Sequence, residues 1–260
     1  GMADPLDGRA IFVAPHLDDV ALSCGGTVAC HASRGQEPLI VTVAAGAPAG
    51  AEAQDMHVDY VGCRRREDAA AAAALGASTE WLPYLDAVYR GYGAEIFGAR
   101  RQESGLVDRI GRDLERRWSE SGSVSVFLPL GIGNHVDHQL CASLHERLRR
   151  VGATVWHYED TPYVLRWAAA ERWINSMELA PLKVAVKPYL EERLVTMGLV
   201  PSVVEVTRQM TGRLAAIECY QSQLAGLFPR RNHRAVIRAY AASLMSKQET
   251  YGERFWAFPS

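Results

Sequence analysis

The 260-residue sequence predicts an α/β fold, a Rossmann-like open and mostly parallel sheet with helices on both faces and an irregular C-terminal extension. Short apolar runs suited to buried parallel strands recur along about the first 160 residues. Segments with helical patterning lie between these runs, an alternation typical of parallel strands joined by right-handed crossovers. Clusters of His and Asp directly follow two of the runs, at the position where open α/β sheets bind ligands.

The apolar runs predict five strands of the parallel sheet. The first is too short for a helix and stops before Pro15. The five strands are expected at 11–13, 39–44, 79–85, 124–130 and 153–158. In the C-terminal part, 184–186 and 203–206 are predicted as short strands that form an antiparallel addition.

Helical spacing of apolar residues predicts the segments that cover the sheet. The helices are expected at 21–34, 64–76, 103–118, 139–150, 208–223 and 234–247. The first contains Gly25-Gly26, which costs helix stability and is tolerated where a helix packs closely on the sheet. The segment 45–62, rich in Ala, Gly and Pro, is predicted as a loop, either a rim or lid of the site or a disordered connector.

Length and composition indicate one globular domain over residues 1–260, with a core at about 8–165 and further strands and helices over 166–260. Apolar residues make up 48% and charged residues 22% of the chain, as is usual for soluble proteins. The net charge of −2 gives no electrostatic reason to expect nucleic acid as a partner. No apolar run approaches the ~20 residues of a membrane span.

The five cysteines are widely spaced and include no C-x-x-C pair. This pattern argues against a disulfide framework and against a cysteine zinc site, so the expected compartment is the reducing cytoplasm. A small molecule is the expected partner, and both a monomer and a homo-oligomer remain open.

The first polar cluster consists of His16, Asp18 and Asp19, between the first strand and the first helix. At such a turn His16 and Asp19 can converge on one point, while Asp18 stays free beside them. A hydrolytic zinc site needs three ligands, an open position for water, and a carboxylate outside the ligand set that takes the proton of that water. His16 and Asp19 supply two ligands, and Asp18 is placed as the base.

The second cluster follows the fourth strand and a glycine-rich break, and it consists of His135, Asp137 and His138. If the two strands are neighbours, His138 becomes the third ligand. We expect His135 to lie over the substrate carbonyl, with Asp137 orienting or charging it. The alternative is structural, because Asp18, Asp19 or Asn134 could simply cap the helices that follow.

The motifs PHLDD at 15–19 and HVDH at 135–138 resemble those of the PIG-L (LmbE-like) superfamily of zinc-dependent N-deacetylases. The resemblance covers roughly the first 160 residues well and the rest in fragments. It implies zinc ligation by His16, Asp19 and His138. The commoner family form has Pro and Glu where this chain has Leu17 and Val20, so a Glu contribution at position 20 is absent.

The resemblance also implies the roles of residues around the ligands: a general base at Asp18 and transition-state support from His135. Arg64, at the start of the helix predicted at 64–76, becomes a candidate for contacting substrate hydroxyls. Asp86 and Tyr89 after the third strand, and the Glu159-Asp160 pair after the fifth, are candidates for a carbohydrate pocket, although turn chemistry explains Asp86 and Tyr89 equally well.

Together these observations predict a zinc-dependent hydrolase that removes the acetyl group from an N-acetylated amino sugar of the N-acetylglucosaminyl type. One alternative is an amidase with the same site that acts on a larger sugar-thiol or antibiotic conjugate. The other is a non-enzymatic Rossmann module that binds a sugar or nucleotide. It is weakened because no G-x-G-x-x-G follows the first strand.

Overall fold

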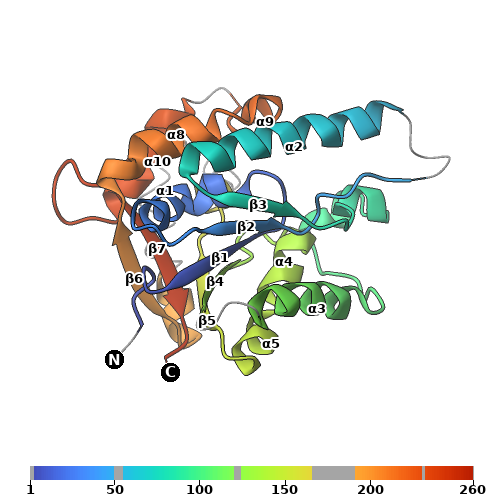
Figure 1. Ribbon diagram of the computed structural model, residues 1–260, viewed down its shortest axis with the longest axis horizontal. Coiled ribbons are helices and arrows are strands. Elements are labelled where there is room, and N and C mark those ends of the chain that lie inside the picture. The colour runs from blue at the N-terminus through green and yellow to red at the C-terminus, as the bar shows by residue number, and fades with distance from the viewer. Residues whose placement is uncertain (1–2, 50–54, 120–123, 166–190, 230–231, 260) are drawn as a thin grey trace, which may run out of the picture.

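A seven-stranded sheet with the order β3-β2-β1-β4-β5-β7-β6 forms the centre of the molecule (Figure 1). The computed structural model describes residues 3–49, 55–119, 124–165, 191–229 and 232–259. The strands are β1 (Arg9–Ala14), β2 (Leu39–Thr42), β3 (Ser78–Trp81), β4 (Val124–Pro129), β5 (Thr154–Tyr158), β6 (Val200–Glu205) and β7 (Gly252–Ala257).

Strands β1 to β5 are parallel, which confirms the predicted α/β class and its mostly parallel sheet. From β1 the chain runs outward to β2 and β3, then returns to pair β4 with the other side of β1. The strand order therefore reverses between β1 and β4. The carboxyl ends of these two strands flank the crevice in which open α/β sheets bind ligands.

Helices cover both faces of the sheet (Figure 1). One face carries α1, α2, α8 and α10, and the other carries α3, α4 and α5. The α-helices are α1 (Asp19–Ser33), α2 (Asp55–Leu75), α3 (Leu106–Ser119), α4 (Val136–Ala142), α5 (His145–Arg150), α8 (Met210–Ile217), α9 (Gln221–Leu227) and α10 (His233–Ser243). Three short 3₁₀ turns are η1 (Ala87–Arg90), η2 (Ala94–Phe97) and η3 (Thr207–Gln209).

The apolar core has two parts because successive strand residues point to opposite faces of the sheet. In β1, Phe12 belongs to the cluster under α1 and α8, whereas Ile11 and Val13 belong to the cluster under α3, α4 and α5. Phe12 stacks on Phe127 of β4 with ring centroids 4.4 Å apart. Every residue of β4 is buried, as expected for a strand covered on both faces.

Helix α1 contains the predicted close approach at its double glycine, and the partner is a strand. The helix is kinked at Cys24, where φ is −148° and ψ is 27°. A Cβ on Gly26 would lie 2.7 Å from Oε1 of Glu253 on β7. That carboxylate accepts hydrogen bonds from the N–H groups of Gly26 at 2.8 Å and Thr27 at 2.7 Å, so it satisfies the backbone donors that follow the kink.

Helix α2 begins at Asp55, so the loop predicted over 45–62 is wrong for its last eight positions, 55–62. Residues 50–54 lie outside the described part of the chain. Gly62 within this segment favoured a loop, but a long-range contact supports the helix: Gln223 of α9 donates to the Tyr60 hydroxyl at 2.9 Å. The third strand also stops earlier than predicted, at Trp81, and Pro83 forms a separate bridge with Ala44.

The C-terminal part adds an antiparallel pair to the sheet. Strand β6 confirms the strand predicted at 203–206, whereas β7 was not predicted. Strand β7 lies between β5 and β6, antiparallel to both, and all its residues are buried. The strand predicted at 184–186 lies outside the described residues. Two predicted helices, 139–150 and 208–223, are each divided, into α4 and α5 and into α8 and α9.

Within the described ranges, each helix is too short or too polar to traverse a bilayer.

Candidate active site

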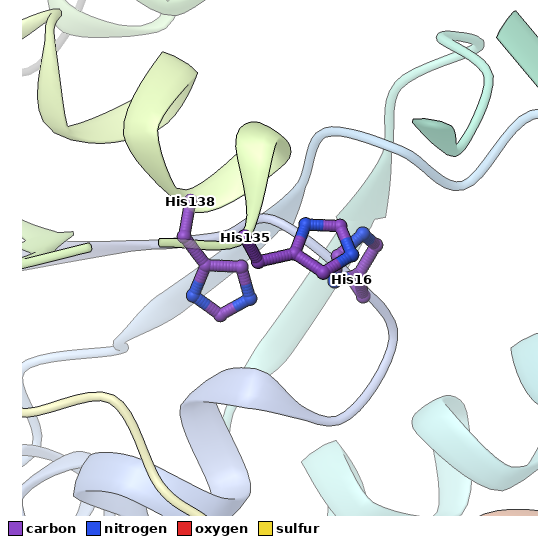
Figure 2. Close-up of side chains that lie close together, drawn as sticks. All are labelled: His16, His135 and His138. Atoms are coloured by element: carbon purple, nitrogen blue, oxygen red, sulfur yellow. The ribbon is translucent and has the colours of Figure 1, made fainter. Parts of the chain in front are cut away.

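The two predicted polar clusters meet at the carboxyl ends of β1 and β4. His16 lies in the loop after β1, and His135 and His138 lie at the start of α4 (Figure 2). One ring nitrogen of each lies within 4.8 Å of the others, and all three side chains are buried. The expectation that these strands are neighbours is therefore confirmed, because β1 pairs directly with β4.

Alternating Asp and His side chains form a continuous Asp-His chain through the site. Its members, in order, are Asp160, His138, Asp19, His16 and Asp137. The two outer contacts are hydrogen bonds, 2.6 Å between Nδ1 of His138 and Oδ1 of Asp160, and 2.9 Å between Nε2 of His16 and Oδ2 of Asp137. The two inner contacts are longer, because Oδ2 of Asp19 lies 3.3 Å from both Nε2 of His138 and Nδ1 of His16.

The inner spacing suits a tetrahedral cation. A zinc ion about 2.0–2.1 Å from each nitrogen and oxygen ligand places neighbouring ligand atoms about 3.3 Å apart. Nε2 of His138 is also buried without a hydrogen-bond partner among the described residues. Both distances to Oδ2 of Asp19 therefore match the spacing that zinc would need from His16, Asp19 and His138, the ligands predicted from the sequence.

A second group of possible ligands, His16, Asp86 and Asp137, lies on the other side of the His16 ring. The Asp137 carboxylate is already engaged there, because it accepts from Nη1 of Arg90 at 2.7 Å and from the N–H of Ala87 at 3.0 Å. A cation would have to compete with these donors. Oδ2 of Asp19 also accepts a hydrogen bond, from the backbone N–H of His16 at 2.7 Å, but it has no guanidinium partner among the described residues, so the group around Asp19 suits a metal better.

Asp18 occupies the N-cap position of α1 but makes no side-chain cap hydrogen bond, so the capping interpretation of this residue is wrong. Its carboxylate is buried beside the ligand-like residues. Burial and the neighbouring Asp19 carboxylate raise the pKa of Asp18 to about 7, although Arg64 opposes the shift. A carboxylate of this kind can exchange a proton near neutral pH.

Arg64 lies next to Asp18 at the rim of the site. Its Nη2 is 3.5 Å from Oδ2 of Asp18 and donates to the Leu17 carbonyl at 3.3 Å. Its Nε is buried and has no hydrogen-bond partner in the described part of the chain. Leu17 and Val20, where the commoner family form has Pro and Glu, are both core residues.

His135 caps helix α4 through its ring. Nδ1 accepts the N–H of Asp137 at 3.2 Å, so the neutral ring carries its proton on Nε2 and can donate it. Burial lowers the pKa of His135 to about 4, which keeps the ring neutral at physiological pH. The ring is T-shaped against His16, with centroids 4.6 Å apart, and it also lies near the rings of His138 at 5.3 Å and Phe97 at 5.5 Å.

Asp137 does not orient His135 as predicted. Its carboxylate accepts from Nε2 of His16, while only its backbone N–H contacts His135. The physical reason is that α4 starts at Val136 with His135 as its cap, which leaves the Asp137 side chain free to reach the loop after β1. Asp137 therefore orients His16 and not His135, although the charge of its carboxylate does act on His135 and raises the pKa of that ring against the effect of burial.

Asp160 was predicted as part of a carbohydrate pocket, and this expectation is wrong. The residue is 0% exposed and contacts His138. Its neighbour Glu159 is also buried and accepts from Nε of Arg254 at 2.5 Å and Nε1 of Trp256 at 2.9 Å. The sequence offered one signal for the contact between Asp160 and His138, namely that Asp160 directly follows the fifth predicted strand.

Asp86 has both of the properties weighed from the sequence. Its Oδ1 accepts the N–H of Val88 at 3.1 Å and caps η1, as turn chemistry predicts. Its Oδ2 lies 3.6 Å from Nε2 of His16, so the residue also faces the site. Arg90, which pairs with both Asp137 and Glu103, was not identified from the sequence because no motif includes it.

The parallel sheet and the His and Asp residues at its strand-order reversal define an α/β protein with a candidate metal-dependent active site. Residues 11–148 match the family model described as PIG-L: GlcNAc-PI de-N-acetylase, and the chain therefore belongs to the PIG-L family. The resemblance stated from the PHLDD and HVDH motifs is confirmed.

Among characterised relatives, 2'-N-acetylparomamine deacetylase of Streptomyces fradiae is 30% identical over 164 residues, 60% of this chain and 58% of that enzyme. The match thus spans less than two thirds of that relative's length. The crystal structure of A40926 pseudoaglycone deacetylase is 27% identical, with a TM-score of 0.70 over 95% of this chain and 96% of that one. The zinc inhibited form of teicoplanin deacetylase is 26% identical, with a TM-score of 0.71 over 95% and 97%.

Proposed function

We propose that this protein is a zinc-dependent hydrolase that removes the acetyl group from an N-acetylated amino sugar of the N-acetylglucosaminyl type. The observation that carries the proposal is the arrangement around Oδ2 of Asp19, with ring nitrogens of His16 and His138 each 3.3 Å away. The name of the family and the names of the relatives, which are deacetylases, support the reaction.

A second candidate is the same reaction on a larger conjugate. It is favoured by the relatives whose structures cover 95% of this chain, since these are named as deacetylases of A40926 pseudoaglycone and teicoplanin. The two candidates share one site and differ only in what is attached to the acetylated sugar.

The proposed metal ligands are Nδ1 of His16, Oδ2 of Asp19 and Nε2 of His138. When bound there, zinc supplies a Lewis acid and lowers the pKa of water toward neutrality. Asp137 holds the other nitrogen of His16 by a 2.9 Å hydrogen bond, which keeps Nδ1 turned toward Asp19.

Asp18 is the proposed general base. It lies next to Asp19 in the chain but points its carboxylate toward Arg64 and not toward the two ring nitrogens. With a pKa near neutrality it can take the proton of the attacking water. Arg64 limits the rise in this pKa. Its buried Nε has no hydrogen-bond partner within the described residues, and the guanidinium is the proposed contact with a substrate hydroxyl.

His135 is the proposed donor to the oxyanion that forms from the acetyl carbonyl. Its Nδ1 is occupied as an acceptor, so Nε2–H is the atom that can donate. Because its pKa is lowered to about 4, the ring holds no extra proton to give away. The proton taken up by Asp18 therefore goes to the leaving amine.

The proposed setting is the reducing cytoplasm, in agreement with five free cysteines. The proposed partner is a small N-acetylated sugar or glycoconjugate, with no role for nucleic acid.

The test is acetate release from a panel of N-acetylglucosaminyl compounds and larger acetylated glycoconjugates, with the metal content measured on the same protein. We expect about one zinc per chain and acetate release with at least one compound. Turnover of only the larger conjugates would favour the second candidate. Binding of sugars without acetate release by zinc-loaded protein would support the non-enzymatic alternative and contradict the proposal.

A further inference from the structure

We infer that Asp160 is a positioning residue that fixes the tautomer of His138, so that the lone pair of its Nε2 faces Asp19. The inference rests on the metal site of the proposed function. It assigns to Asp160 a role in metal binding without direct contact with the metal.

The Asp160 carboxylate is held so that it can only accept from His138. Its Oδ2 accepts two backbone hydrogen bonds, from the N–H groups of Gly131 and Ile132, both at 2.9 Å. Its Oδ1 lies 2.6 Å from Nδ1 of His138. A carboxylate has no proton of its own to donate when ionised, so Nδ1 must carry the hydrogen. The neutral ring then has its lone pair on Nε2.

Within the described residues, the Asp160 carboxylate is the hydrogen-bond partner of Nδ1 of His138, and burial keeps other partners away. The His138 side chain is 1% exposed, and that of Asp160 is 0% exposed, so water does not substitute at Nδ1. Nε2 has no hydrogen-bond partner among the described residues and lies 3.3 Å from Oδ2 of Asp19. The tautomer set by Asp160 is therefore the one that presents an electron pair to a cation.

The other end of the Asp-His chain has a different anchor. Asp137 is held by a guanidinium, that of Arg90, and shares one oxygen between His16 and the N–H of Ala87. The oxygen of an amide at position 137 could face either Arg90 or the pair of donors from His16 and Ala87. A substitution of Asp137 by Asn therefore offers no clean test of a tautomer. At position 160 the two backbone N–H groups can donate only to an oxygen, so an amide there must turn its oxygen toward them.

Asp160→Asn should therefore reverse the tautomer. The amide oxygen keeps the contacts with Gly131 and Ile132, and the amide NH₂ faces Nδ1 of His138. Since NH₂ donates, the ring must accept at Nδ1 and carry its proton on Nε2, where the metal should bind. Removing a partner of this kind typically weakens metal binding about 10–100-fold.

Asp160→Ala separates the tautomer from the loss of charge. It removes the same negative charge, but the space left by the carboxylate can hold a water molecule that accepts from Nδ1, so the ring can keep its proton there. The substitution also leaves two backbone N–H groups without their acceptor, which costs stability. We expect Asp160→Ala to be the less stable variant, yet to bind zinc more tightly than Asp160→Asn.

The matched control is Glu159→Gln, at the adjacent buried carboxylate. Glu159 contacts Arg254, Trp256 and Tyr240, and none of these contacts involves His138. This variant should lose stability without a change in zinc affinity.

The experiment measures zinc dissociation constants of the full chain by competition with a chromophoric chelator, and thermal unfolding of each metal-free protein. Equal zinc affinity in wild type and Asp160→Asn, or tighter binding by Asp160→Asn than by Asp160→Ala, would overturn the inference. So would weakened binding in Glu159→Gln, or an Asp160→Asn chain that does not fold. If wild type itself binds no zinc, the proposed function fails, whereas an unaffected Asp160→Asn contradicts only this inference.

Discussion

Buried charges serve two different purposes on the two sides of this sheet. On the parallel side, the Asp-His chain crosses the carboxyl ends of β1 and β4. On the antiparallel side, Glu253 of β7 pairs with Arg213, and Glu159 pairs with Arg254 of the same strand β7. All of these side chains are buried, so burial alone does not distinguish a site from a scaffold.

The difference lies in which kind of buried atom lacks a hydrogen-bond partner. Both oxygens of Glu253 accept backbone hydrogen bonds, from Gly26 and Thr27 of α1, and both oxygens of Glu159 meet donors from Arg254, Trp256 and Tyr240. In the Asp-His chain, the atom without a hydrogen bond within the described residues is Nε2 of His138, a ring nitrogen that can present a lone pair. The unpartnered atoms of the scaffold pairs, Nε of Arg213 and Nη2 of Arg254, belong to guanidinium groups, which carry protons and cannot bind a cation. Buried carboxylates whose two oxygens both accept hydrogen bonds stabilise the fold, whereas a ring nitrogen that faces a carboxylate oxygen at 3.3 Å without a hydrogen bond indicates a ligand site.

The largest effect on zinc binding is expected from a substitution of Asp19, because its Oδ2 faces the rings of both His16 and His138. Asp19→Ala should reduce the zinc content from about one per chain to close to none, because two ligands without a carboxylate hold zinc weakly. Activity should be lost with the metal. Elemental analysis and acetate release check both, and full zinc in this variant would show that Asp19 is not a ligand.

The second largest effect is expected for Asp18, where a substitution should change the catalytic rate without changing the zinc content. Asp18→Asn should keep zinc and lower turnover about 10²–10⁴-fold, the usual contribution of a positioned proton-transfer group. The thermal midpoint should change little, because Asp18 makes no cap hydrogen bond with α1. Loss of zinc would instead make Asp18 a ligand, and full activity would remove its role as the base.

On the scaffold side, Glu253→Ala should lower the free energy of unfolding by about 3–5 kcal/mol, because it leaves Arg213 buried without its counter-charge. Zinc bound per folded chain should stay the same. Chemical denaturation measures the first and metal analysis the second. The control is Glu205→Ala, at an exposed position of β6, expected within about 0.5 kcal/mol of wild type. A Glu253→Ala variant as stable as this control would contradict the scaffold role.

The smallest effect concerns a buried histidine pair outside both groups. Nδ1 of His145 in α5 lies 2.9 Å from Nε2 of His157 in β5. Burial lowers the pKa of both histidines, and that of His157 falls to about 4. The unfolded chain therefore binds more protons than the folded chain between about pH 4 and 6.5. Stability should be constant above this window and fall as the pH drops through it.

For His157 alone, the loss between pH 7 and pH 5.5 should be about 1 kcal/mol. Unfolding free energies of wild type and His157→Gln across this range check the sign, since the variant should show the weaker dependence on pH. An equal dependence in the two proteins would assign the acid sensitivity to other groups.

The sequence alone determined the parallel half of the sheet and the two polar clusters. Strand and helix periodicity is local, so the runs at 11–13 and 124–130 identified β1 and β4 from their own residues. Position directly after a strand is also a local property. The carboxyl ends of neighbouring parallel strands share one edge of the sheet. Position after a strand was therefore enough to group His16, Asp19 and His138 as one predicted ligand set.

Only the tertiary structure decided which carboxylate supports which histidine. The partners of the outer hydrogen bonds are 121 residues apart for His16 and Asp137 and 22 apart for His138 and Asp160. No pattern along the chain encodes such distances. The same applies to β7, whose insertion between β5 and β6 places Glu253 against the kink of α1. Local sequence specifies elements and their polar ends, whereas the pairing of buried charges depends on how the whole chain closes around them.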